Sequence, residues 1–473
     1  MTGLESAGLT DELGEMIIIE MGDFVQLFAE SFEIASNADG TDRAPEVKPT
    51  CPRWHELRKL PFVAEPYPTL AAARESGPAR VIGELGGAPV WLVTRYDDAR
   101  AVLAHPAVSN DFYDAPWWVK RARELGIAPP ADDHHSRNLP LAMEDERHVR
   151  ARTVLVKAVN ARRVDAVRPV VERTANELLD ALPAGEPIDV NARFAVPLAN
   201  TALAAVLGIP KDMALTYPGW SDQINSHMLD PQTARVAAGK FYGFVAALMQ
   251  EKRNALADDV LSDLWRACDD GILSDFEMHG LVALLLHAGQ EAPAAVANGL
   301  LSLLRHPAQL AKILSNPSLL PSGIEELLRY ESSLAQALPR HTNGPVELEG
   351  VTIPPREYII VSVVGANHDP ARFDHPDEVD VTRQARSHLA FGYGTRRCVG
   401  ARLGTMVATI GLDALLTRYP AVHLAHPDQS TPWRPSTFSR RVESLSVVLA
   451  ESLLDVGPRS PLTSSPRHNV SSH

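Results

Sequence analysis

The chain has 473 residues, of which 45% are hydrophobic and 22% are charged, a balance that indicates a globular protein and excludes a wholly disordered chain. Its formal net charge of -14 argues against a general nucleic-acid-binding protein, because contacts with phosphate require a basic surface. The three cysteines, Cys51, Cys268 and Cys398, are too few for a disulfide framework and too far apart for a metal knuckle, so we expect a reducing, cytoplasmic compartment.

Residues 1–55 are expected to form a separate N-terminal extension, partly disordered, with an amphipathic helix around Ile17 to Phe32. We interpret it as a loosely attached arm, with a helix that docks a partner as the alternative. Its most apolar stretch, Met16–Met21, is too short to span a bilayer and lacks the basic start of a signal peptide. We therefore expect no membrane segment there.

Residues 56–455 alternate helical patterns with a few short strands, and we assign them to one domain. The clearest strands are residues 90–94 and 358–363. No regular alternation of strand and helix is visible, so the predicted fold class is mainly α with smaller β regions. Residues 456–473 are rich in Ser and Pro and are predicted to be a disordered tail.

A long buried helix is predicted between Ser274 and Arg305. Ser274 and Glu277 form a capping box, and a nearly continuous apolar run follows it. About 30 residues at 1.5 Å each would extend roughly 45 Å, enough to cross the domain. Pro293 has no N–H to give to the carbonyl of Gly289, so we expect a kink there with a free carbonyl. A mere packing irregularity is the alternative.

A second capping box, Ser322 with Glu325, predicts that another helix begins there. Glu326 and Arg329 follow on one face of this helix and are spaced to form a charge-assisted pair. Taken alone, such a pair is typical of a weak, exposed surface bridge.

The segment from Phe391 to Gly400 carries the strongest chemical signal. Two close glycines, Gly392 and Gly394, indicate a tight turn with unusual backbone angles. Cys398 then comes directly before a helical pattern, where free N–H groups and the helix dipole lower the pKa of a thiol. This environment favours a thiolate that binds a metal, with an inert buried cysteine as the alternative.

This segment resembles the haem loop of the cytochrome P-450 family, F-G-x-G-x-[HR]-x-C-x-G, and the resemblance extends over roughly residues 60 to 450. It implies the P-450 fold, with haem b between the long central helix and the helix after the cysteine loop. It also implies that Cys398 is the axial thiolate that pushes electron density toward O–O cleavage. Every fixed position is met, by Phe391, Gly392, Gly394, Arg396, Cys398 and Gly400.

The resemblance assigns further residues to the cofactor. Glu326 and Arg329 match the family's E-x-x-R element, whose implied role is to lock the core around the haem. His148 and Arg152 match its H-x-x-x-R element, which reaches the two haem propionates from one helix. Buried propionates must be paired with cations. The remaining implied cofactor contacts are Arg340, His388, Arg396, Phe391, Gly392 and Gly400.

The central helix departs from the family pattern at one position. The usual [AG]-G-x-[DE]-T reads Ala288-Gly289-Gln290-Glu291-Ala292, so alanine replaces the threonine whose hydroxyl helps deliver protons to dioxygen. We hypothesise that protons arrive through ordered water, a substrate hydroxyl or amide, or Glu291 and Gln290, with Gly289 in the same groove. Chemistry with a smaller need for protons, such as radical coupling of aromatic rings, is the alternative.

The regions that line the substrate pocket in the family are rich in aromatic and large apolar residues, which would suit a bulky or aromatic ligand. Ordinary core packing is the alternative for each of them. They are Phe112, Tyr113, Trp117, Trp118, Leu285, Leu334, Leu338, Thr437 and Phe438.

The resemblance thus predicts a monooxygenase or oxidative coupling enzyme acting on a small molecule, a secondary metabolite or a peptide-like or carrier-bound substrate. The alternatives are a silent haem-fold recruitment module, against which the intact Cys398 argues, and a peroxide-driven variant. No flavin, nucleotide or iron–sulfur motif is visible, so electrons should come from NAD(P)H through a reductase and a ferredoxin or flavodoxin. Arg150, Arg397 and Arg402 are candidate cations for docking it, or a merely solvated face.

Overall fold

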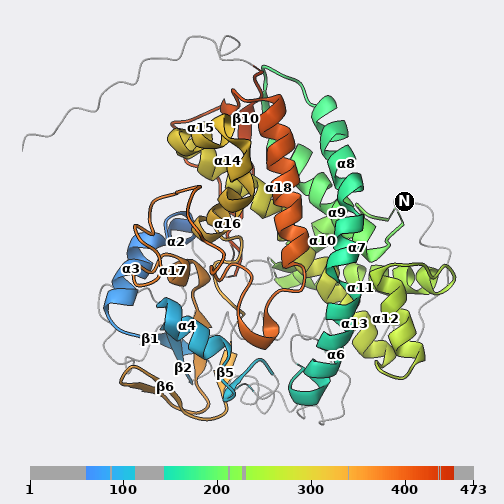
Figure 1. The fold of residues 1–473 in the computed structure, drawn as a ribbon. Coiled ribbons are helices and arrows are strands. Elements are labelled where there is room, and N and C mark those ends of the chain that lie inside the picture. Colours follow the sequence, from blue (N-terminus) through green and yellow to red (C-terminus); the bar gives the residue numbers. More distant parts are fainter. Residues whose placement is uncertain are drawn as a thin grey trace, which may run out of the picture.

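The computed structural model describes residues 60–85, 88–111, 115, 143–210, 213–225, 231–338, 340–434, 436 and 438–451 (Figure 1). The predictions for the N-terminal extension and for the C-terminal tail lie outside these residues. So do five of the candidate pocket residues, Phe112, Tyr113, Trp117, Trp118 and Thr437.

Helices make up most of the fold. In the first half of the chain they are α2 (Leu60–Ala64), α3 (Tyr67–Glu75), α4 (Tyr96–Leu103), α6 (Asp145–Ala158), α7 (Ala161–Ala166), α8 (Arg168–Asp180), the π-helix η3 (Asn191–Ala195), α9 (Val196–Leu207), α10 (Pro218–Asn225) and α11 (Pro231–Arg253). In the second half they are α12 (Val260–Asp269), α13 (Asp275–Gly289), α14 (Ala292–Arg305), α15 (Pro307–Ser315), α16 (Leu320–Tyr330), α17 (Val363–Asn367) and α18 (Ala401–Arg418), with the 3-10 turns η4 (Pro317–Leu319) and η5 (Gly394–Arg396).

The strands form three small sheets. The largest has the order β1-β2-β8-β5-β3, in which β2 and β8 are parallel and the other pairs are antiparallel. A second sheet has the order β4-β10-β9, and β6 pairs with β7. The strands are β1 (Ala79–Leu85), β2 (Ala88–Val93), β3 (Val108–Ser109), β4 (Pro187–Asp189), β5 (Arg340–Thr342), β6 (Val346–Leu348), β7 (Val351–Ile353), β8 (Tyr358–Val361), β9 (His423–Leu424) and β10 (Ser446–Val448).

Both strands expected from the sequence are present and pair with each other, Val90 opposite Tyr358. The second one is shorter than predicted. It ends at Val361, because the side chain of Ser362 accepts a hydrogen bond from the N–H of Gly365 and thereby caps α17. The predicted fold class, mainly α with smaller β regions, is confirmed.

The long central helix is present as two consecutive segments, α13 and α14, and the capping box of Ser274 and Glu277 forms as predicted. The chain from Asp275 to Arg305 is apolar and long enough to span a membrane, yet more than half of its most apolar window is buried inside the fold. Core packing therefore accounts for its hydropathy, because α14 packs against α9, α16 and α18.

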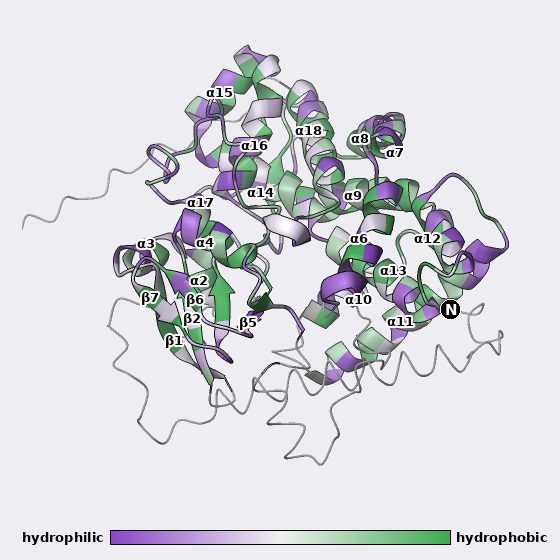
Figure 2. Cartoon of the chain, turned by 60° about the horizontal axis from the view of Figure 1, so that its bottom comes forward, coloured by the Kyte–Doolittle hydropathy of each residue, from purple (hydrophilic) through white to green (hydrophobic). Residues whose placement is uncertain are grey.

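Figure 1 shows α18 running beside α14 and α8, with the large sheet and α4 forming a separate region below them. The close approach of the central helices depends on small residues: a Cβ on Gly299 of α14 would lie 3.2 Å from a methyl group of Leu412 in α18. The outer helices, α8 and α12 among them, carry both hydrophilic and hydrophobic residues, as expected for helices with one face on the core (Figure 2).

The capping box predicted at Ser322 does not form. Helix α16 begins earlier, at Leu320, because the 3-10 turn η4 leads directly into it and Pro321 fits its first turn. The hydroxyl of Ser322 donates instead to the carbonyl of Leu319, at 2.9 Å. Glu325 is therefore free to contact another part of the chain.

Candidate active site

The cysteine loop has the tight geometry that its glycines predicted. Gly392 and Gly394 have φ angles of 71° and 76°, which residues other than glycine rarely adopt. The N–H of Cys398 donates to the carbonyl of Phe391 at 2.8 Å, and this bond closes the loop before α18 begins. The thiol is thus held at the start of a helix by a rigid turn.

Cys398 is exposed at the surface of its site, yet the many protein atoms around it raise the pKa of its thiol, because this desolvation outweighs the groups that favour the thiolate. Those groups are the N–H donors of Gly400 and Ala401 and the charges of Arg152 and Arg397. The helix N-terminus alone would lower the pKa of this thiol. The pKa is raised instead, because the sequence reveals the N–H donors but not the protein atoms that surround the thiol.

Four of the predicted cofactor-binding cations meet beside this loop. His148 and Arg152 come from α6, Arg340 from β5 and Arg396 from the loop itself. Burial and the charges of Arg396 and Arg152 lower the pKa of His148 to about 4. Burial, together with the charge of Arg396, lowers the pKa of Arg340 to about 10. Glu144, 3.0 Å from Arg396, is the carboxylate that opposes these charges.

This cluster has more positive charge than Glu144 balances. Cations that repel one another in a half-buried space are stabilised when an anion enters it. The two propionates of a haem have the required charge, so the donor set fits that cofactor. The sequence did not point to Glu144 as a member, although an acid placed four residues before His148 was a visible signal.

His388 has other partners. Its ring is buried, Nδ1 accepts a hydrogen bond from the N–H of Ala390 at 3.1 Å, and Nε2 lies 3.3 Å from a carboxylate oxygen of Glu325 in α16. This contact with His388 lowers the pKa of Glu325. The structure therefore ties His388 to α16 and not to the cation cluster, because α16 starts early enough to place Glu325 opposite it.

The Glu326–Arg329 pair is fully buried, unlike the exposed bridge that such a pair forms in isolation. Their charged atoms lie 2.7 and 2.9 Å apart. Arg329 also donates to the carbonyls of Asn367 and Pro376, both at 2.8 Å, and Glu326 accepts from Arg383 at 3.0 Å. The pair joins α16 to the irregular segment that leads to the cysteine loop.

The predicted kink in the central helix is a full break at Gln290 and Glu291. At this break the side chain of Arg441 donates a buried hydrogen bond to the backbone carbonyl of Gln290, at 3.0 Å. On the largely buried helix pair, the partly exposed positions Leu285, Ala288, Ala292 and Ala295 recur every three or four residues. Ala292 comes seven residues after the candidate pocket residue Leu285, the spacing of two helical turns, on the other side of the break.

Gly289 and Gln290 face away from that side, toward α9. A Cβ on Gly289 would lie 2.4 Å from a methyl group of Leu203, so a side chain at this position would force that methyl group to move. The amide of Gln290 is buried and donates to Asn200 at 2.9 Å. The Gln290 side chain is therefore bound to α9, while the groove roles of Gly289 and Gln290 stay predictions.

Glu291 is held by the turn near the C-terminus. Ser439 donates to its Oε1 at 2.7 Å, and Nε of Arg441 lies 3.7 Å from the same oxygen. Arg441 also bonds Asp222 of α10 at 3.1 Å. Sequence reasoning assigned this turn to the substrate pocket but missed Ser439 and Arg441, whose polar character after Phe438 was the available signal.

Two candidate pocket residues come together at this turn. Leu334 forms a β-bridge with Ser439, and the N–H of Ala335 donates to the carbonyl of Phe438 at 2.7 Å. Leu338 accepts a bond from Arg340 at 2.8 Å through its carbonyl and so adjoins the cation cluster. The segment 334–340 thus connects the pocket turn with the cofactor-binding cations.

Comparison with known proteins agrees with this arrangement. The family model described as Cytochrome P-450 matches residues 227–440. The chain is 34% identical to Cytochrome P-450 107B1 of Saccharopolyspora erythraea, over 82% of this chain and 95% of that protein. It is 35% identical to Cytochrome P-450 monooxygenase PikC of Streptomyces venezuelae, over 82% of this chain and 91% of that protein.

Solved structures give the same result. The tirandamycin C-bound monooxygenase TamI superposes with a TM-score of 0.73 at 31% identity, covering 83% of this chain and 99% of that one. The structure of P-450BioI in complex with a fatty-acid-ligated acyl carrier protein superposes with a TM-score of 0.72 at 26% identity, covering 82% of this chain and 100% of that one.

Proposed function

The chain belongs to the cytochrome P-450 family, and from this premise we propose that it oxidises a bulky secondary metabolite with a haem b held by Cys398. The observation that carries the proposal is the cluster of His148, Arg152, Arg340 and Arg396 beside the Cys398 loop, whose charge Glu144 only partly balances. A thiolate next to a binding site for two carboxylates fits haem, which has one metal ion and two propionates.

In this proposal Cys398 is the protein ligand of the metal and Phe391 packs beside it. The charges of Arg152, Arg340 and Arg396 pair with the propionates, and His148 donates a hydrogen bond to them. When bound through a thiolate, haem supplies the activation of dioxygen. Gly392 and Gly394 permit the backbone turn that presents the thiolate at the start of α18. Gly400 follows beside the thiol, where a Cβ would lie 3.8 Å from Sγ of Cys398. The buried Glu326–Arg329 pair holds the segment before the loop in place.

The substrate is proposed to lie against the face of Leu285, Ala288 and Ala292, with Leu334, Leu338 and Phe438 beside it. These side chains are apolar, which favours a bulky hydrophobic ligand. The similar monooxygenase TamI was solved with tirandamycin C bound, whereas P-450BioI was solved with a fatty-acid-ligated acyl carrier protein. We favour a free small molecule, with hydroxylation as the reaction and oxidative coupling as the alternative.

Proton delivery must work without a hydroxyl at Ala292. The Gln290 side chain is committed to Asn200, which argues against a proton route through it. Glu291 keeps its Oε2 atom without a hydrogen-bond partner among the described residues while Ser439 holds Oε1. We therefore assign proton supply to ordered water or a substrate hydroxyl near Ala292. Glu291, the residue next to Ala292, is the acid that would exchange protons with it.

Electrons are proposed to come from NAD(P)H through a reductase and a ferredoxin or flavodoxin in the cytoplasm. The test is the difference spectrum of the reduced protein with carbon monoxide. A Soret band at the long wavelength of thiolate ligation is expected for the wild type and should be lost in Cys398→Ser. A histidine-type band in the wild type would overturn the proposal. Turnover with hydrogen peroxide alone, and none with redox proteins, would establish the peroxide-driven variant instead.

A further inference from the structure

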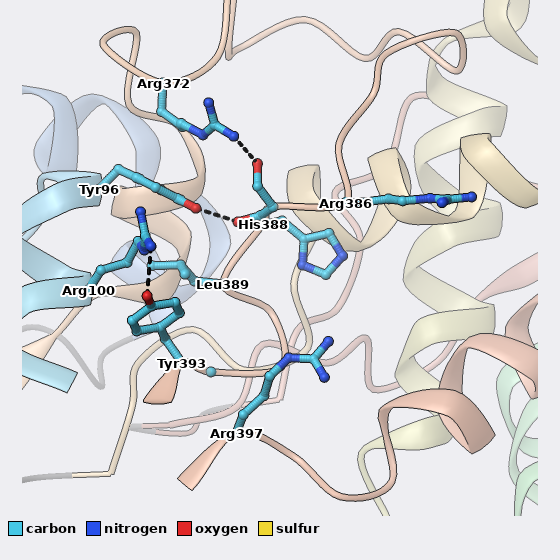
Figure 3. A pocket seen from close by; sticks show the side chains of 10 residues that line it. Tyr96, Arg100, Arg372, Arg386, His388, Leu389, Tyr393 and Arg397 are labelled. Atoms are coloured by element: carbon cyan, nitrogen blue, oxygen red, sulfur yellow. Dashed lines mark hydrogen bonds between the residues drawn. The ribbon is translucent and has the colours of Figure 1, made fainter. Parts of the chain in front are cut away.

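An open pocket of about 330 Å³ is lined by basic and hydroxyl side chains from three parts of the chain (Figure 3). Tyr96 and Arg100 come from α4, Arg372 and Ser387 from the irregular segment after α17, and Tyr393 from the cysteine loop. None of the residues that line the pocket is an Asp or Glu, and none is among the four that we assign to the haem propionates. The pocket is therefore a second concentration of positive charge, in a chain with a net charge of -14.

Two of the arginines share one aromatic ring. The guanidinium carbons of Arg100 and Arg372 lie 5.7 and 5.4 Å from the centre of the Tyr96 ring. Like charges held around a single ring repel each other, and an anion that contacts both relieves this repulsion. Figure 3 shows Arg386 extending away from this pair, so Arg100 and Arg372 form the charged wall of the pocket.

The hydrogen bonds of this wall leave donors unused. Arg100 donates to the hydroxyl of Tyr393 at 2.7 Å, and Arg372 donates to the hydroxyl of Ser387 at 2.7 Å. Both hydroxyl oxygens are acceptors in these bonds, so each keeps its own proton for a further acceptor. The Nε atom of Arg100 is buried and has no hydrogen-bond partner in the described part of the chain. The wall thus has more donors than acceptors.

Carboxylates of the chain compensate the charge of this wall only weakly. Asp97 lies 3.8 Å from Arg100, but its side chain is 92% exposed, so solvent screens the pair. Arg372 has no ion pair with another described residue. The carboxylate of Glu325 interacts instead with the two other arginines of the pocket, Arg386 and Arg397. A ligand at the wall therefore needs negative charge and hydrogen-bond acceptors.

We propose that this pocket binds the phosphate group of a small molecule. Arg100 and Arg372 are its counter-ions, and the hydroxyl groups of Tyr393 and Ser387 donate to it. A phosphate dianion balances two guanidinium groups, its oxygens are strong acceptors, and the planar guanidinium fork matches it in two-point contacts. A volume of about 330 Å³ is at the lower end of small-molecule sites, which leaves room for an organic group joined to the phosphate. The inference goes beyond the proposed function, because this site requires neither haem nor the oxidised substrate.

The test is isothermal titration calorimetry of the haem-loaded protein with inorganic phosphate and with glucose 6-phosphate at constant ionic strength, and with glucose as the neutral probe. Both phosphates should bind to the wild type, and glucose should not. Arg100→Gln with Arg372→Gln should weaken binding at least about tenfold, because two charge-assisted contacts are lost. Arg402→Gln is the matched control, an exposed arginine that Asp165 already binds at 2.6 and 3.0 Å, and should change the affinity less than about twofold.

Tighter binding of glucose 6-phosphate would identify the ligand as an organic phosphate, and equal affinities would identify it as the free ion; either result supports the site. Absence of binding of both phosphates to the wild type, an unchanged affinity in the double variant, or an equal loss in Arg402→Gln would overturn it. The two substituted arginines are exposed or half-exposed, so the double variant should fold. An unchanged melting temperature in phosphate-free buffer checks this and separates loss of the site from damage to the fold.

Discussion

The hydroxyl of Ser439 donates a 2.7 Å hydrogen bond to Oε1 of Glu291, joining a turn near the C-terminus to the break in the central helix. The two residues are 148 positions apart in the chain. Arg441 supports the contact from the same turn by bonding the carbonyl of Gln290. The only acid in the motif of the central helix is therefore positioned by a part of the chain that forms no recognisable motif.

Removing this contact should lower the fraction of electrons that end in product, and should affect haem binding less. Ser439→Ala deletes a charge-assisted hydrogen bond, and we expect hydrogen peroxide released per NADPH oxidised to rise by about threefold to tenfold. Arg434→Gln is the control, since the ion pair of Arg434 in the described part of the chain is with Asp222 and not with Glu291. Equal peroxide release in both variants would show that Ser439 does not position the acid.

Placing a hydroxyl at the family's usual position should have the opposite effect. Ala292→Thr is expected to lower peroxide release per NADPH severalfold, because the added hydroxyl can pass protons on the partly exposed helix face. Ala295→Thr adds the same group three residues further along that face and serves as the control. If Ala292→Thr leaves the coupling of electron use unchanged, our account of this helix is wrong.

The buried Glu326–Arg329 pair should be far more costly to break than an exposed pair of similar chemistry. Glu326→Gln leaves the Arg329 charge buried with one fewer partner, and we expect a loss of about 3–5 kcal/mol in the free energy of unfolding. Glu177→Gln breaks the exposed Arg173–Glu177 pair and should cost less than about 1 kcal/mol. Denaturant unfolding of the two variants measures the difference, and similar losses would contradict it.

The requirement for glycine at Gly289 should be a packing requirement. Gly289→Ala places a methyl group 2.4 Å from Leu203, and the strain should destabilise the fold by about 1–3 kcal/mol. Combining it with Leu203→Ala removes the clash. Thermal unfolding should then show the double variant less destabilised than the sum of the two single variants. Simple additivity would mean that Gly289 serves another purpose.

Stability at acid pH should depend on the contact between Glu325 and His388. The pKa of Glu325 lies below its ordinary value in the folded protein, so its contribution is fully present above the ordinary carboxyl pKa and is lost as the pH falls through the lowered folded pKa. Glu325→Gln should therefore lower the melting temperature at neutral pH and have less effect below pH of about 4. A difference that is independent of pH would contradict this origin.

Much of this protein could be predicted because its signals are local. The capping box at Ser274, the break before Pro293 and the glycine turns of the cysteine loop each depend on a few adjacent residues, and the backbone rules that govern them act over the same distance. The predicted capping box at Ser322 failed for a related reason. A preceding turn and Pro321 started the helix before the box could act.

By itself, then, the sequence determined the family, the helical class, the identity of the thiolate loop and the spacing of Glu326 with Arg329. Only the tertiary structure decided that this pair is fully buried, that Gln290 faces Asn200, and that Arg402 is bound by Asp165. The physical reason is that burial and charge compensation depend on side chains brought from distant parts of the chain. Arg402 and Arg397 are near neighbours in the sequence, yet a carboxylate 237 positions away neutralises only the first.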